Sequence, residues 1–254
     1  MAHDLATWLK FTEKLLQTGC ALVNDRQLPI TGKGASDPSV LVITLLARSI
    51  SNLRGVVLLV REGLVVEART LVRCIFENLF RVGGLVTEGD AFVKEMFRDE
   101  LTSRKLRGKI VLDRPMEDKE FEDRLRSHIE QMNEKYPRTK FLTPRQASEK
   151  SPLKVAYLWY SQLSSDAAHP SVSALRRHIV GVVDNETLRG IDVAPKANQE
   201  ELANTVDLAC YAFISVLVGV NQMLPGTSAN DSTNEVFAEY QVLAGIERPR
   251  NEHH

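Results

Sequence analysis

The sequence predicts an all-α fold, a multi-helix bundle with a small β-hairpin near residues 179–193. Apolar residues recur at three- and four-residue spacing along most of the 254 residues, which is the periodicity of helices with one buried face. Capping residues mark several helix starts, among them Asp37 before Pro38 and Asn198. Since 43% of the residues are hydrophobic, we expect one large helical domain over residues 1–254.

Three helices are expected in the first third of the chain. The first covers residues 4–24, and the second runs from Pro38 to about residue 62 and is apolar around much of its circumference, so it should be central. Gly63 ends it, and the short link predicts that the third helix, residues 64–86, packs antiparallel beside it. Gly83 and Gly84 are expected to loosen the end of this third helix.

Residues 88–150 are richer in charge and are expected to form a charged helical insertion or lid. A helix over residues 90–111 is followed by a break at 113–115 and by an exposed helix over 117–135. Prolines and polar residues then predict a loop over residues 136–151.

The last third of the chain should return to the bundle. Ser151-Pro152 is expected to cap a helix that His169-Pro170 ends, because the residue before a proline avoids helical geometry. A short helix over 171–178 and a hairpin with its turn at Asp184-Asn185 should follow. We expect a long helix from Asn198 to Met223, and then residues 225–254 as a C-terminal extension with a helix over 233–244.

Composition narrows the class of protein. Lys and Arg number 32 against 33 Asp and Glu, so the net charge of −1 argues against a protein that coats nucleic acid through a global positive field. The three cysteines are far apart, and an odd count without CxxC spacing suits a reducing compartment. The N-terminus lacks the features of a signal peptide, and Asn221 and Gln222 interrupt the apolar run 208–224. We therefore expect a cytoplasmic protein without a membrane partner.

A polar stripe on the third helix is the first candidate site. Thr70, Arg73, Glu77 and Arg81 follow spacings of three, four and four, so they lie on one helical face. The surrounding residues are mostly apolar, which predicts that part of the stripe is buried or lines a cleft. Charges in such surroundings need partners. The stripe is consistent with a structural buried network and with a ligand or catalytic site.

The second candidate site lies in residues 158–170. It contains Tyr160, Ser164, Ser165 and His169. His169 could bond the last carbonyls of a helix, or act as an acid or base because the pKa of histidine lies near neutrality. A Ser/His/Asp hydrolase is not favoured, since there is no G-x-S-x-G elbow. No dinucleotide, phosphate-loop or zinc motif is present, so no cofactor or metal is predicted.

Two basic clusters are the candidates for nucleic-acid or phosphate contact. They are Arg104, Lys105, Arg107 and Lys109, and the run Arg176-Arg177-His178. Charge runs of this kind are usually solvated helix faces, and RNA contact remains the alternative.

The two candidate segments together resemble a family of bacterial helical proteins of unknown function. In that family an R-x-x-x-E element on a long apolar helix is followed by a Tyr…Ser…His-Pro element. Here these match Arg73 and Glu77, then Tyr160, Ser164 and His169-Pro170, over roughly residues 40–180. The resemblance implies an all-α bundle and no particular activity.

A more remote resemblance is to HEPN-type helical proteins, many of which are metal-independent ribonucleases of toxin and phage-defence systems. Their usual signature places an arginine four to six residues before the catalytic histidine. Residues 161–168 contain no arginine, so this resemblance implies that Arg73 supplies the cation from another helix.

Two hypotheses follow. The first is a cytosolic binding or structural module, whose partner or small-molecule ligand the sequence does not identify. The second is a HEPN-like ribonuclease, expected to be a homodimer that acts on RNA. The candidate catalytic residues are His169, Arg73 and Glu77, and the candidate binding residues are Tyr160, Ser164, Ser165 and Arg81.

Overall fold

The computed structural model describes residues 4–24, 32–137, 140–168, 171–181, 190–224 and 229–246. The elements in chain order are α1 (Leu5–Asn24), η1 (Gly34–Ser36), α2 (Pro38–Arg61), α3 (Val65–Glu88), α4 (Asp90–Leu112), α5 (Lys119–Lys135), α6 (Pro144–Glu149), α7 (Ala156–Leu163), η2 (Ser164–Ala168), α8 (Val172–Arg176), β1 (Ile179–Val180), β2 (Gly190–Ile191), α9 (Gln199–Met223) and α10 (Ala229–Leu243). The predicted all-α class is confirmed, and β1 pairs antiparallel with β2 as the small hairpin. The predicted turn at Asp184-Asn185 lies outside the described residues.

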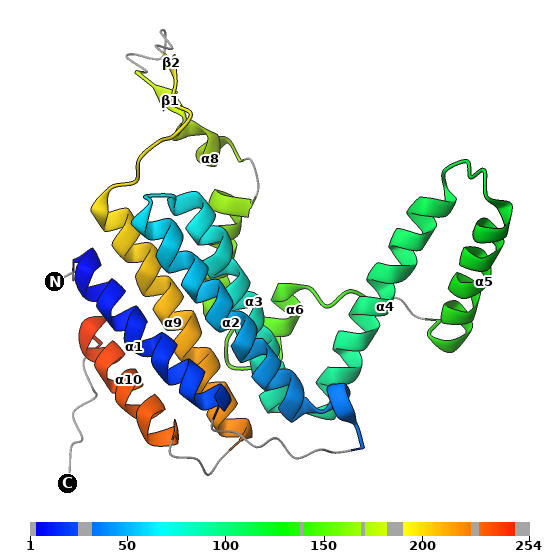
Figure 1. The fold of residues 1–254 in the computed structure, drawn as a ribbon, viewed down its shortest axis with the longest axis horizontal. Helices are drawn as coiled ribbons and strands as arrows, with labels where there is room; N and C mark the ends of the chain where they lie inside the picture. Colours follow the sequence, from blue (N-terminus) through cyan, green and yellow to red (C-terminus); the bar gives the residue numbers. More distant parts are fainter. Residues whose placement is uncertain are drawn as a thin grey trace.

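Helices α1, α2, α3, α9 and α10 form the bundle, in which they lie side by side (Figure 1). Helix α3 packs against both α2 and α9 and also contacts α4, α6, α7 and η2. Its rings Phe76 and Phe80 are fully buried, as is Phe213 of α9. Each such side chain contributes about 1.5–3 kcal/mol by leaving water. The bundle core is therefore centred on α3 and α9.

The predicted starts of the long helices are confirmed by their caps. The Asp37 carboxylate accepts a hydrogen bond from the Ser39 backbone N–H at 2.8 Å, and the Asn198 side chain accepts one from Glu201 at 2.8 Å. Gly63 has a φ of +76° and forms the tight link between α2 and α3. These local signals depend on neighbouring residues only, which is why the sequence reveals them.

Helices α4 and α5 project from the bundle as a hairpin, here called the arm (residues 90–135; Figure 1). Gly89, with a φ of +51°, ends α3 and begins α4, so no loop separates the two helices. Ile129 of α5 is buried against α4, where it lies close to Gly108. Phe121, near the start of α5, is 44% exposed, in agreement with the expectation of an exposed helix. Beyond Phe92 and Val93, which pack at its base, the arm therefore holds little apolar surface away from water.

The expectation that Gly83 and Gly84 loosen the end of α3 is wrong. The helix continues to Glu88. A Cβ atom at Gly84 would lie 2.3 Å from the fully buried ring of Phe92, so the missing side chain allows α4 to approach. The glycines serve close packing, which is compatible with an intact helix.

Two further boundaries differ from the prediction. Helix α6 lies inside the expected loop 136–151, and it begins with a capping box in which Thr143 and Gln146 bond each other's backbone. Ser151-Pro152 does not start a helix: residues 151–155 form turns, α7 begins at Ala156, and the π-helical segment η2 follows it. The Ser151 hydroxyl group bonds the Ser148 carbonyl, so it does not cap a helix. His169-Pro170 lies outside the described residues.

Candidate functional site

The polar stripe on α3 faces α7 and η2, which the sequence places some ninety residues later. Arg73 and Glu77 meet Tyr160 of α7, and the three residues are here called the tyrosine cluster. Arg73 donates from Nε and Nη2 to the Tyr160 hydroxyl oxygen at 3.1 and 3.0 Å. The Tyr160 hydroxyl group donates to Glu77 Oε1 at 3.1 Å, and Arg73 Nη2 lies 3.2 Å from the same oxygen. Every member of the cluster thus contacts the other two.

Packing fixes the Tyr160 ring within this cluster. Its neighbours are Phe80, edge-on at a centroid distance of 5.7 Å, and Tyr157, stacked at 5.6 Å. The Arg73 guanidinium carbon lies 5.2 Å from the ring centroid, within the range of a cation–π contact. The tyrosine is buried, whereas the side chains of Arg73 and Glu77 retain 25% and 23% exposure. The cluster is therefore a partly solvated contact between α3 and α7.

The protonation state of Tyr160 follows from its surroundings. Burial raises the pKa of the phenol, the Arg73 hydrogen bond lowers it, and the Glu77 carboxylate raises it further, with a net increase. Burial lowers the pKa of Arg73, but the hydrogen bond to Tyr160 and the charge of Glu77 outweigh this effect. At neutral pH the phenol remains protonated, so it can donate to Glu77 while it accepts from Arg73. Tyr160 is not a base in this arrangement.

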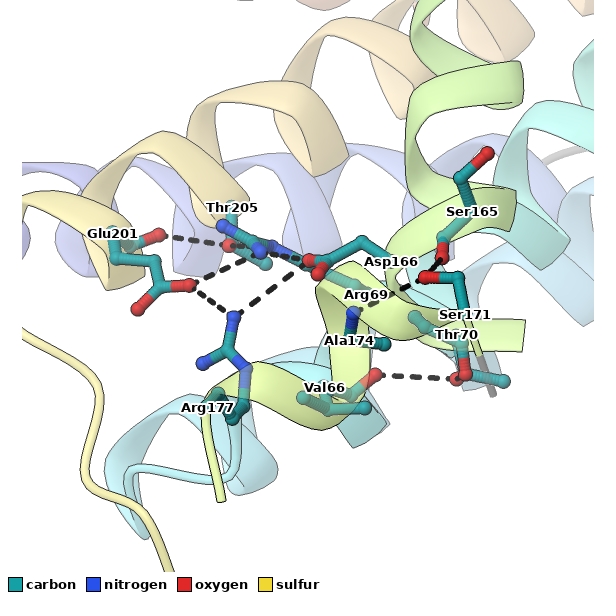
Figure 2. A network of polar contacts seen from close by, with 11 residues as sticks. Val66, Arg69, Thr70, Ser165, Asp166, Ser171, Ala174, Arg177, Glu201 and Thr205 are labelled. Atoms are coloured by element: carbon teal, nitrogen blue, oxygen red, sulfur yellow. Dashed lines mark hydrogen bonds and ion pairs between the residues drawn. The ribbon is translucent and has the colours of Figure 1, made fainter. Parts of the chain in front are cut away.

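A second group, here called the arginine cluster, lies one turn closer to the start of α3 (Figure 2). Arg69 pairs with Asp166 of η2 and lies 3.1 Å from Glu201 of α9, and its Nε donates to Thr205 at 3.2 Å. Arg177, which follows α8, donates to Glu201 at 2.6 Å and lies 3.8 Å from Asp166. Two guanidinium groups and two carboxylates therefore join four separate elements.

The two arginines of the arginine cluster are matched by two carboxylates, but one N–H group of Arg177 has no hydrogen-bond acceptor among the described residues. The hydrogen bond to Glu201 raises the pKa of Arg177 more than burial lowers it, so the guanidinium is held charged. Its Nε atom is buried and has no hydrogen-bond partner within the described residues. The other contacts of the cluster neutralise both arginines, which makes it a cross-link among α3, η2, α8 and α9.

Sequence reasoning missed most of the arginine cluster. Arg69 lies four residues before Arg73, so the helical spacing that selected the polar stripe also selects it. Asp166 follows Ser164 and Ser165 directly, and the sequence gives no sign that it pairs with an arginine of the third helix. Glu201 carries no local signal, because it resembles any acidic residue in the first turn of a helix.

The remaining candidate residues do not join either cluster through their side chains in the part of the chain that the structure describes. Arg81 Nη1 donates to the Glu77 carbonyl at 3.2 Å, within its own helix. The exposed Ser165 hydroxyl group donates to the Ser161 carbonyl, and Ser164 is partly buried in η2. His169 lies outside the described residues. Thr70 approaches η2 through a 3.4 Å hydrogen bond to the Ala167 carbonyl.

Each of the two predicted basic clusters contains cations that the fold holds in structural contacts, although Arg104, Arg107, Lys109 and Arg176 are exposed. Lys105 is buried and donates to the Tyr136 carbonyl at 2.5 Å, and Arg104 pairs with Glu100. Arg177 belongs to the arginine cluster. His178 bonds the Asp192 carbonyl beside the hairpin. Several of these cations therefore have structural partners within the chain.

Metal binding and a ligand cavity at the tyrosine cluster also lack support. Within the described residues, no group of three or more His, Cys, Asp or Glu side chains is arranged to hold a metal ion. Of the four cavities described, none is lined by Arg73, Glu77 or Tyr160. The arrangement therefore offers hydrogen bonds and fixed charge, in geometry that suits the connection of helices.

Comparison with known proteins gives one match. Residues 39–187 match a family of unknown function, DUF5677. The chain belongs to this family. The match begins in α2 and includes all of α3, α7, η2 and α8, so it covers the tyrosine cluster, whereas Glu201 and Thr205 lie beyond it. No curated protein and no solved structure matches this DUF5677 chain.

Proposed function

We propose that this DUF5677 protein is a helical binding or structural module without catalytic activity, in which the two polar clusters hold α7, η2 and α8 against α3 and α9. The observation that carries the proposal is that each member of the tyrosine cluster contacts the other two. Two Arg73 donors contact the Tyr160 oxygen, and the tyrosine proton is directed at Glu77. A reacting group would have to break these contacts before it could serve a substrate.

Replacement of Tyr160 tests this structural role. Tyr160→Phe leaves the ring but removes the hydroxyl group, so the partly buried Arg73 and Glu77 lose a shared partner. We expect the free energy of unfolding to fall by about 1–3 kcal/mol. For a chain of this size each kcal/mol lowers the Tm by about 2–4 °C, which calorimetry detects.

Tyr157→Phe is the matched control. Tyr157 stacks on Tyr160, and its hydroxyl group has no hydrogen bond that the described residues show. The same deletion there should leave the Tm unchanged. Equal melting temperatures for Tyr160→Phe and wild type would contradict a structural tyrosine cluster.

A HEPN-like ribonuclease is the second candidate, and one observation favours it. The chain that leads into His169 lies against the face of α3 that carries Arg73, through Asp166 bonded to Arg69 and Ala167 bonded to Thr70. In this alternative His169 accepts the proton of a ribose 2′-hydroxyl group as its oxygen attacks phosphorus, and Arg73 stabilises the negative charge on the phosphoryl oxygens. We propose a homodimer as its active form.

Metal-free cleavage of total RNA separates the two candidates. The ribonuclease predicts cleavage by the wild-type protein and none by His169→Ala at the same folded fraction. The binding module predicts no cleavage by either protein. Light scattering on the same samples measures whether the chain forms the dimer that the ribonuclease would use.

We also propose a cytoplasmic location. Within the described residues, α2 and α9 are long and apolar enough to cross a membrane, which is weak support for a membrane protein. About half or more of each apolar window is buried in the bundle, as in a core helix of a soluble protein. Fractionation of cells should place the protein in the soluble fraction, and its recovery with the membranes would contradict the proposal.

A further inference from the structure

A cavity of about 450 Å³ lies where the arm meets the bundle, between α4, the end of α5 and the chain that returns through α6. We propose that it binds a nucleoside phosphate, with cations on the phosphate and aromatic side chains beside the base. The volume lies within the roughly 300–1,000 Å³ of small-molecule sites. The cavity is separate from both polar clusters.

Charge gives the first argument for an anionic ligand. Arg98, Lys135 and Lys140 line the cavity, and none of them has an acidic partner among the described residues. Lys150 also lines it, 2.9 Å from Glu95, the acidic residue of the lining. Lys150 also lies 3.0 Å from Glu88, so these three residues together carry one net negative charge. Arg98, Lys135 and Lys140 outweigh it and leave the cavity with a net positive charge, in a chain whose net charge is −1. Lys and Arg side chains that converge in this way suit phosphate groups.

The walls of the cavity are held in place, which is the second argument. The Leu142 backbone N–H donates to Asp99 at 2.9 Å, and the Lys140 N–H donates to Thr102 at 3.2 Å, so this segment is fastened along α4. The buried Lys105 fixes the Tyr136 carbonyl. Helix α6 is capped at Thr143. A preformed site loses less conformational entropy when a ligand binds.

Two aromatic rings give the third argument and narrow the ligand class. Tyr136 and Phe141 line the same cavity, and Phe141 is 46% exposed. The Lys135 ammonium lies 5.5 Å from the centroid of the Tyr136 ring. Exposed aromatic side chains beside cations are the usual elements that stack a base and bind its phosphate. Inorganic phosphate alone would leave the rings without a partner.

Calorimetric titration of the full-length protein tests the proposal. The probes are AMP, GMP, CMP and UMP, with adenosine and inorganic phosphate for comparison, at low ionic strength. We expect at least one nucleotide to bind, adenosine and phosphate to bind at least tenfold more weakly, and affinity to fall as salt is added.

Variants then locate the site. Arg98→Gln and Lys140→Gln should each weaken nucleotide binding about tenfold or more, since each removes a charge-assisted hydrogen bond to the phosphate group. Lys94→Gln, an exposed residue of α4 outside the lining, removes the same charge and should bind as the wild type does. Circular dichroism confirms that each variant is folded. Failure of all the nucleotides to bind, binding that the cavity variants leave unchanged, or equal affinity for phosphate would overturn the proposal.

Discussion

At the scale of single residues, Asp207 of α9 shows how a partly buried carboxylate couples stability to pH. Burial raises its pKa above the ordinary 3.8, and the hydrogen bond that it accepts from Tyr240 at 3.0 Å only partly offsets this effect. The folded protein therefore holds the Asp207 proton more tightly than the unfolded chain does. This contribution to stability is complete below pH 3.8 and is lost as the pH rises through the raised pKa.

Replacement of the Asp207 carboxylate by an amide should remove the loss of stability that occurs as the pH rises. In Asp207→Asn the amide oxygen still accepts from Tyr240, but no charge has to be buried. We expect the Tm of the variant, relative to wild type, to increase as the pH is raised from about 4 to 7. Thermal melts across this range measure the difference.

Asp123→Asn supplies the comparison, because Asp123 is exposed on α5. The difference in Tm between Asp123→Asn and the wild type should change little with pH. If the Tm of Asp207→Asn relative to wild type stays constant or falls as the pH rises, the fold does not raise the pKa of this carboxyl group.

Gly84 is the second residue whose role can be tested. A methyl group there would lie 2.3 Å from the ring of Phe92, which cannot move away because it is fully buried. We expect Gly84→Ala to lower the free energy of unfolding by about 1–2 kcal/mol, although alanine favours helix by roughly 1 kcal/mol. Denaturant unfolding measures it. Gly32→Ala, where no atom lies within 4 Å, should show no loss, and a stabilised Gly84→Ala would contradict close packing at this point.

At the scale of elements, the arginine cluster makes the attachment of η2 and α8 depend on α9. Glu201 accepts from Arg177 and pairs with Arg69 (Figure 2). In Glu201→Gln, Asp166 is the carboxylate that remains within ion-pair distance of both arginines. Because the side chains are only partly exposed, we expect a loss of about 1–3 kcal/mol in the free energy of unfolding.

Glu120→Gln is the matched control for this prediction. Glu120 pairs with Arg124 on the arm, where the two side chains are 80% and 64% exposed, so its loss should stay below about 1 kcal/mol. Chemical denaturation of both variants gives the comparison. Equal losses would mean that the arginine cluster is no stronger than an ordinary surface ion pair.

Local signals explain which elements the sequence revealed. Asp37 and Asn198 mark helix starts because a cap depends on residues two or three positions away. The sequence does not predict helix α6, because prolines are common in loops, although proline also suits the first turn of a helix, as Pro144 does after Thr143. Ser151 resembled a cap, but burial directs its hydroxyl group to the Ser148 carbonyl.

The candidate site was only partly predictable for a related reason. Helical spacing placed Arg73 and Glu77 on one face of α3, and the family resemblance added Tyr160, which the structure brings to them. Glu201 joins the arginine cluster through the packing of α9 on α3, a relation between distant segments. Periodicity within one helix contains no information about such pairs.

At the scale of the whole molecule, the bundle and the arm should differ in local stability. Helix α9 contributes many fully buried side chains, whereas Ile129 is the buried residue of α5. Amide hydrogen exchange should therefore be at least about 100-fold slower in the middle of α9 than in α5. Mass spectrometry of labelled peptides measures both helices in one sample, in which the whole chain serves as its own control. Equal protection would mean that the arm unfolds only with the bundle.

Because α3 joins α4 directly at Gly89, a small rotation at this joint produces a large displacement at the far end of the arm. With 23 residues, α4 is about 35 Å long, so a rotation of about 10° at Gly89 moves its far end by about 6 Å. Lys150 braces this joint, because its ammonium group bonds Glu88 on one side and Glu95 on the other. A change in the bonding of Lys150 that rotated α4 would therefore move the arm tip several times farther than the joint itself.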